Sequence, residues 1–109
     1  MLSSRLGRLP RQEVFGVAFP VARGPRSRLL GLAGLGRDEA GEGLLIPACA
    51  SVHSFGMRFP LDLIWLDVDG GPLAVRLGVP PRRLAWQRGA AAVLEVPSWE
   101  GGEILQPWA

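Results

Sequence analysis

The stretch Leu61–Val79, LDLIWLDVDGGPLAVRLGV, decides the fold of this chain. Its opening residues, LDLIWLD, are large and apolar enough to predict a β-strand, with Trp65 in the core. The Asp69-Gly70 pair tolerates the positive φ angles of a tight turn, and Asp67 is placed to shape that turn. The apolar residues after Pro72 then form the returning strand. The sequence therefore predicts an antiparallel β-hairpin over this stretch.

Short apolar segments bounded by glycine and proline lie on both sides of the hairpin. Further strands are predicted at Glu13–Phe19, from Leu44, at Ala91–Val96 and at Glu103–Gln106. Leucines at a three-residue spacing predict one short helix over residues 26–35, whose interior glycines suggest close packing against the sheet. The expected fold is mainly β (β-rich α+β), a small barrel-like sheet of five or six short strands with one short helix after the first strand.

The length of 109 residues fits a single domain, and 48% hydrophobic with 20% charged residues is the composition of a folded globule. We expect residues 1–12 to be a flexible, arginine-rich end and residues 13–109 to form the domain. No apolar run is long enough for a signal peptide or a membrane span, so the expected location is the cytoplasm.

The charge is unevenly distributed along the chain, although the formal net charge is only +2. Residues 1–37 hold seven arginines against Glu13, whereas residues 38–109 hold five arginines against nine acids. Clustered arginines suit phosphate or an acidic partner. The chain has no nucleic-acid-binding motif and no interleaved aromatic residues to stack bases, so nucleic acid is not the expected partner.

Cys49, His53 and Met57 recur at a spacing of four in the irregular segment 48–60. That spacing places side chains on one face of a helix or of a strand, and the three ligand types favour copper. Cysteine and methionine are also common core residues, and one histidine is often simply hydrogen-bonded, so no metal is expected. A Cys49–His53 nucleophilic pair is a further alternative, which requires that the two side chains touch.

Two acids interrupt predicted apolar strands. Asp62 lies between two leucines, and Glu95 lies between Leu94 and Val96. Burial of either acid without a partner is costly, so each points to solvent or pairs inward, with Arg58 and His53 as the nearest candidate partners of Asp62. If the two acids lie together beside a pocket, the pair suits acid–base chemistry.

Four segments, taken in order, resemble the blocks of the domain-of-unknown-function family 192. They are RLLGLAGL (residues 28–35), CASVHSFGMRFPLDLIWLD (residues 49–67), the pair Pro81-Arg82, and VLEVP (residues 93–97). The resemblance implies a compact barrel-like β domain with a short helix after the first strand, and no established activity. It also implies recurring residues at Met57, Pro60 and Asp62, which moves the expected site toward Met57, Asp62 and Glu95. After VLEVP the chain departs from the family pattern.

These observations favour a non-catalytic domain that binds a small ligand or a peptide, or an accessory protein, without a cofactor. The expected pocket residues are His53, Met57, Arg58, Asp62 and Glu95. The alternative is a small hydrolase-like enzyme that uses Asp62 and Glu95 or Cys49 and His53. A third hypothesis is binding of nucleic acid or an acidic partner through the N-terminal arginines. The sequence leaves the ligand, the protein partner and the oligomeric state open.

Overall fold

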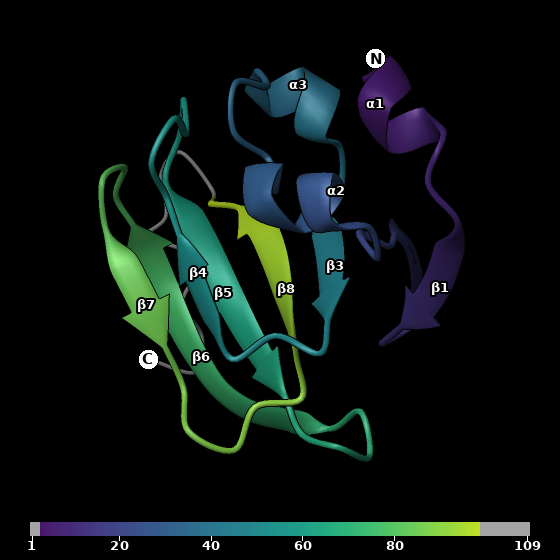
Figure 1. Ribbon diagram of the computed structural model, residues 1–109, viewed down its shortest axis with the longest axis vertical. Helices are drawn as coiled ribbons and strands as arrows, with labels where there is room; N and C mark the ends of the chain where they lie inside the picture. Colours follow the sequence, from purple (N-terminus) through teal and green to yellow (C-terminus); the bar gives the residue numbers. More distant parts are fainter. Residues whose placement is uncertain (1–2, 99–109) are drawn as a thin grey trace.

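A four-stranded antiparallel sheet forms the centre of the computed structural model, which describes residues 3–98 (Figure 1). Its strands follow the order β3 (Leu44–Pro47), β8 (Ala92–Pro97), β5 (Leu61–Leu66) and β6 (Pro72–Val79). The predicted hairpin is confirmed, because β5 and β6 pair antiparallel. Asp67 does shape the turn: its Oδ1 accepts the backbone N–H groups of Asp69 and Gly71, both at 2.9 Å.

Two smaller antiparallel ribbons flank the sheet. One pairs β1 (Arg11–Val14) with β2 (Val17–Pro20), and the other pairs β4 (Ser51–His53) with β7 (Leu84–Trp86). The prediction of one strand over residues 13–19 is therefore wrong. The chain reverses at Phe15 and Gly16, whose φ angles of 52° and 82° are those of a two-residue hairpin turn.

Three short helices lie together at one end of the molecule (Figure 1): α1 (Ser4–Gly7), α2 (Pro25–Leu30) and α3 (Arg37–Ala40). Helix α2 occupies the first part of the predicted helix, and α3 lies in a segment for which no helix was predicted. The segment expected to be a flexible end instead carries α1, and Leu6 is 1% exposed. The arginine-rich composition of this segment predicted an exposed end. Arg5 instead folds back onto the domain and donates hydrogen bonds to the carbonyl oxygens of Gly31 and Ala33.

The two faces of the sheet are covered differently. One face packs Leu61, Leu63, Trp65 and Val93 against residues from the helices and from the β4–β7 ribbon. Trp65 is fully buried there, as the sequence predicted. The other face meets the β1–β2 ribbon through a second cluster, which consists of Val14, Phe19, Val21, Leu45, Leu66 and Leu94. We call these the helix-covered face and the ribbon-covered face.

The fold class is mainly β, as predicted, but the arrangement of strands is not the expected one. Residues 3–98 form eight strands and three short helices rather than five or six strands and one helix. The sheets are not closed into a barrel, so the barrel-like expectation is wrong. The strand expected at residues 103–106 lies outside the described residues. No helix within residues 3–98 is long and apolar enough to cross a membrane.

Candidate functional site

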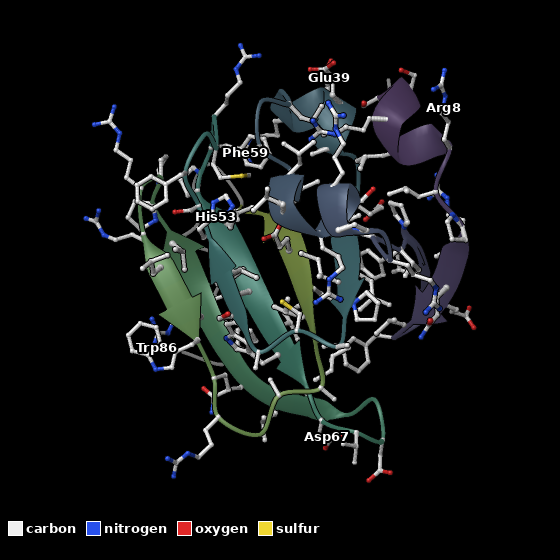
Figure 2. All side chains as sticks on the ribbon, in the orientation of Figure 1. Arg8, Glu39, His53, Phe59, Asp67 and Trp86 are labelled. Carbon is white, nitrogen blue, oxygen red and sulfur yellow. The ribbon has the colours of Figure 1, made fainter. Side chains whose placement is uncertain are left out.

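A cleft of about 330 Å³ lies on the helix-covered face, between α2 and β4. Its lining includes Arg28 and Gly31 from α2 and its C-terminal end, Cys49 and His53 from β4 and the loop before it, and Glu95 from β8. Figure 2 shows His53 next to α2. The cleft therefore brings together two of the predicted pocket residues, His53 and Glu95, with Cys49.

Glu95 is the buried acid of this cleft. It opposes Leu63 on β5, so its side chain enters the helix-covered face, and the residue is only 2% exposed. Burial raises the pKa of the Glu95 carboxyl to about 7, and a hydrogen bond from the backbone of Leu32 acts in the opposite direction. Its Oε1 atom is buried and has no hydrogen-bond partner within residues 3–98. Such an atom costs free energy unless another molecule satisfies it.

Gly31 makes room for this carboxyl at the end of α2. It ends the helix with φ 53° and ψ −126°, a conformation that side chains with a Cβ rarely adopt. A Cβ at this position would lie 2.6 Å from Glu95 Oε1. The sequence prediction that glycines here pack closely against the sheet is confirmed at Gly31.

Backbone contacts hold the rim of the cleft in place. The Arg28 guanidinium donates hydrogen bonds to the carbonyl oxygens of Pro47 and Ala48, the second at 3.0 Å. Cys49 Sγ donates to the carbonyl oxygen of Ser51 at 2.9 Å. The Arg28 bonds tie α2 to the end of β3 and to the residue after it, and the Cys49 bond holds the start of β4, so the rim has a defined shape.

His53 uses both of its ring nitrogens on backbone groups. Nε2 lies 2.9 Å from the carbonyl oxygen of Leu29, and Nδ1 accepts the N–H of Phe55 at 3.2 Å. These partners assign the proton of the neutral ring to Nε2. Because both nitrogens are occupied, His53 is not arranged to take a proton from Cys49, and the geometry offers no support for a Cys49–His53 nucleophilic pair.

The remaining predicted site residues lie elsewhere. Met57 is 7% exposed and belongs to the core cluster, so it does not join Cys49 and His53 as a third metal ligand. Arg58 is exposed and does not line the cleft. Within residues 3–98, no three side chains of His, Cys, Asp or Glu are grouped to hold a metal ion.

Asp62 lies on the opposite face of the sheet from Glu95. It opposes Val96 on β8, one position along from the Leu63–Glu95 pair, and neighbouring residues of a strand point to opposite faces. Its Oδ1 accepts hydrogen bonds from the backbone N–H of Gly78, at 2.8 Å, and from the Ser98 hydroxyl. The hypothesis of an Asp62–Glu95 acid–base pair beside one pocket is therefore wrong.

Sequence reasoning selected Glu95 but missed Arg28 and Gly31 as parts of the same site. The glycine-containing run LLGLAGL predicted close packing, but it could not identify the residue against which Gly31 packs. That partner is an acid more than sixty residues later in the chain, brought there by the sheet order β3-β8-β5.

The fold and the cleft together define a small, mainly β domain with an unpartnered acid at the base of a surface cleft. The family model of DUF192, described as "Uncharacterized ACR", matches residues 10–100, and the chain belongs to this family. No curated protein matches the chain in sequence.

Two crystal structures share the fold. One, from Novosphingobium aromaticivorans, is described as a protein of unknown function; it has 22% identity and a TM-score of 0.61, over 80% of this chain and 69% of that one. The other, from Sinorhizobium meliloti, is described as a "putative transcription regulator"; it has 19% identity and a TM-score of 0.67, over 81% of this chain and 78% of that one. At these identities the likeness concerns the fold alone.

Proposed function

We propose that this protein is a non-catalytic binding domain whose small-molecule ligand occupies the cleft between α2 and β4. The observation that carries the proposal is the Glu95 carboxyl, which is buried at the base of the cleft with Oε1 unpartnered. Natural proteins seldom leave such an atom unsatisfied, and a ligand group is one way to satisfy it. The cleft volume of about 330 Å³ is at the small end of the range for ligand pockets.

The surroundings of Glu95 suit binding better than catalysis. A carboxyl with a pKa of about 7 has the value of a general acid or base, which favours the hydrolase-like alternative. Hydrolysis through a protein nucleophile also needs a base beside it, and the Cys49–His53 pair is otherwise engaged: Cys49 donates to Ser51, and both His53 nitrogens contact the backbone. Binding requires no further group, so it is the preferred function.

Nucleic-acid binding, which the description of the Sinorhizobium meliloti structure brings to mind, has less support in this chain. Four of the seven arginines among residues 1–37 donate to backbone carbonyl oxygens within the domain: Arg5, Arg11, Arg28 and Arg37. An arginine engaged in this way has fewer N–H groups for phosphate. These arginines have a structural role in the fold.

A fragment screen that follows the backbone amides by two-dimensional NMR tests the proposed site. We expect fragments that bind to shift the amide signals of Gly31, Leu32, Ser51 and His53 in a saturable manner. The Asp62→Asn variant, altered on the other face, is the matched control and retains these shifts. A second cavity of about 300 Å³, lined by Asp62, Ile64 and Val75, lies apart from this cleft. Binding confined to that cavity, or no saturable shift at the α2–β4 cleft, contradicts the proposed site.

A further inference from the structure

At the base of the α2–β4 cleft, no donor within residues 3–98 reaches Oε1 of Glu95. The backbone N–H of Leu32 lowers the pKa of the Glu95 carboxyl, yet Oε1 has no hydrogen-bond partner within residues 3–98. An oxygen of a carboxylate accepts, and it accepts most strongly from a charged donor. An N–H or O–H group of a ligand would complete this carboxyl.

The charged and titratable groups around Glu95 have other partners. Arg5 of α1 donates to the carbonyl oxygens of Gly31 and Ala33, and Arg28 of α2 donates to those of Pro47 and Ala48. The thiol of Cys49 and the His53 ring of β4 bond to backbone groups as well. Within residues 3–98, no cation thus pairs with the Glu95 carboxyl.

We propose that the ligand carries a protonated amine, and that its ammonium group pairs with the carboxylate of Glu95. This inference rests on the proposed binding function. A cationic N–H donor both satisfies Oε1 and compensates the charge of a carboxylate in a buried position. A neutral hydroxyl satisfies the oxygen without compensating the charge, and an anion does neither.

The ammonium group reaches Oε1 by a small outward displacement of α2. Oε1 itself is buried, so the cleft must widen at its base before contact. Of the three helices in the described chain, α1 buries Leu6, α3 buries Ala40, and α2 buries none of its residues. The helix that covers the acid therefore has no buried side chain to expose, and its displacement breaks the hydrogen bonds of Arg28 to Ala48 and of His53 to Leu29.

Binding of the ammonium group releases a proton below neutral pH. The neutral Glu95 carboxyl loses its O–H proton to solvent, and the resulting carboxylate pairs with the ammonium, which keeps all of its own protons. Because the pKa of Glu95 in the folded protein without ligand is about 7, the affinity for the amine falls as the pH falls through this value. Between pH 8 and pH 6 the expected loss of affinity is about ten-fold.

Three probes of one shape test the ligand class: benzylamine, benzyl alcohol and benzoate. Each is titrated into the full chain and followed through the amide signals of Gly31 and Leu32. We expect benzylamine to bind most tightly, to lose about ten- to a hundred-fold in affinity in Glu95→Gln, and to keep its affinity in Asp62→Asn. The pH series on the unaltered protein needs no variant, so it holds even if Glu95→Gln folds poorly.

The outcomes separate this inference from the function on which it rests. If benzyl alcohol or benzoate binds at Gly31 and Leu32 as tightly as benzylamine, the cleft remains a ligand site and the amine inference is overturned. Equal benzylamine affinity at pH 6 and pH 8 also overturns it. If none of the three probes, nor any screened fragment, shifts these signals, the proposed function itself fails.

Discussion

Asp62 and Glu95 lie on adjacent strands, one position out of register, and their environments differ completely. Asp62, on the ribbon-covered face, is half-buried and accepts two hydrogen bonds within the domain, from Gly78 and Ser98. Glu95, on the helix-covered face, is 2% exposed, and one of its oxygens has no partner within residues 3–98. The same kind of side chain is a structural link on one face and an unsatisfied group on the other.

The comparison teaches that the position of an acid on a strand does not decide its role. What decides it is whether all of its oxygens have hydrogen-bond partners. A satisfied carboxylate contributes modestly to stability, and its loss costs the bonds it makes. An unsatisfied buried carboxyl costs stability in the free protein, and that cost is recovered when a ligand supplies the missing donor. Four main substitutions, with their comparison variants, test the roles of the two acids and of the cleft.

The largest effect is expected from Gly31→Ala, which places a methyl group against Glu95 Oε1. Backbone strain and the close contact at 2.6 Å together predict a loss of roughly 2–5 kcal/mol in the free energy of unfolding, measured by urea denaturation. Gly34→Ala is the matched control, since Gly34 is exposed, has a φ of 81°, and has nothing within 4 Å of the position of an added Cβ.

Gly34→Ala is expected to lose roughly 1–3 kcal/mol, because it carries the backbone strain of a positive φ without a close contact of the added methyl group. The difference between the two glycine variants then measures the crowding of the acid. Adding Glu95→Ala to Gly31→Ala is expected to recover that difference. Equal losses at both glycines would show that Glu95 has room to move aside, and the carboxyl would then not be held in place.

The next effect concerns pH. The pKa of Glu95 rises from 4.5 to about 7 on folding because of burial, so between these values the folded protein holds a proton that the unfolded chain releases. The stability that this group contributes is fully present below pH 4.5 and is lost as the pH rises through 7. The expected loss from this group is about 3 kcal/mol.

Glu95→Gln removes this dependence, because the amide stays neutral throughout. We expect urea denaturation between pH 4.5 and pH 8 to show that the free energy of unfolding of the variant rises, relative to that of the original protein, as the pH rises. Exposed Glu42→Gln is the control and follows the original profile. Parallel profiles for the original protein and Glu95→Gln would mean that Glu95 ionises as freely in the folded protein as in the unfolded chain.

The sequence revealed the central hairpin and the two acids, because those depend on local patterns. LDLIWLD followed by Asp69-Gly70 specifies a strand and a turn whatever surrounds them. Which face each acid enters depends on the register between β5 and β8, and on α2 crossing over β8, and both are long-range. Helices of four residues, such as α1 and α3, have too few turns to leave a periodic pattern.

A smaller effect is expected on the ribbon-covered face. Asp62→Ala removes the acceptor of the Gly78 N–H and of the Ser98 hydroxyl, which predicts a loss of roughly 1–2 kcal/mol in urea denaturation. Ser98→Ala removes one of these bonds and loses less. Benzylamine affinity stays unchanged in both. If Asp62→Ala weakened benzylamine as much as Glu95→Gln, the two faces would not be separate.

The smallest effect is expected from Cys49→Ser, and it separates binding from nucleophilic catalysis within the cleft. The serine hydroxyl can donate to the same Ser51 carbonyl oxygen as the thiol does, so stability should change by less than about 0.5 kcal/mol. Benzylamine affinity, followed at Gly31 and Leu32, should stay within about two-fold, because the ammonium pairs with Glu95 and makes no use of the sulfur. Loss of a measured ester- or thioester-cleaving activity in Cys49→Ser, with stability unchanged, would instead make the thiol a nucleophile and the cleft an active site.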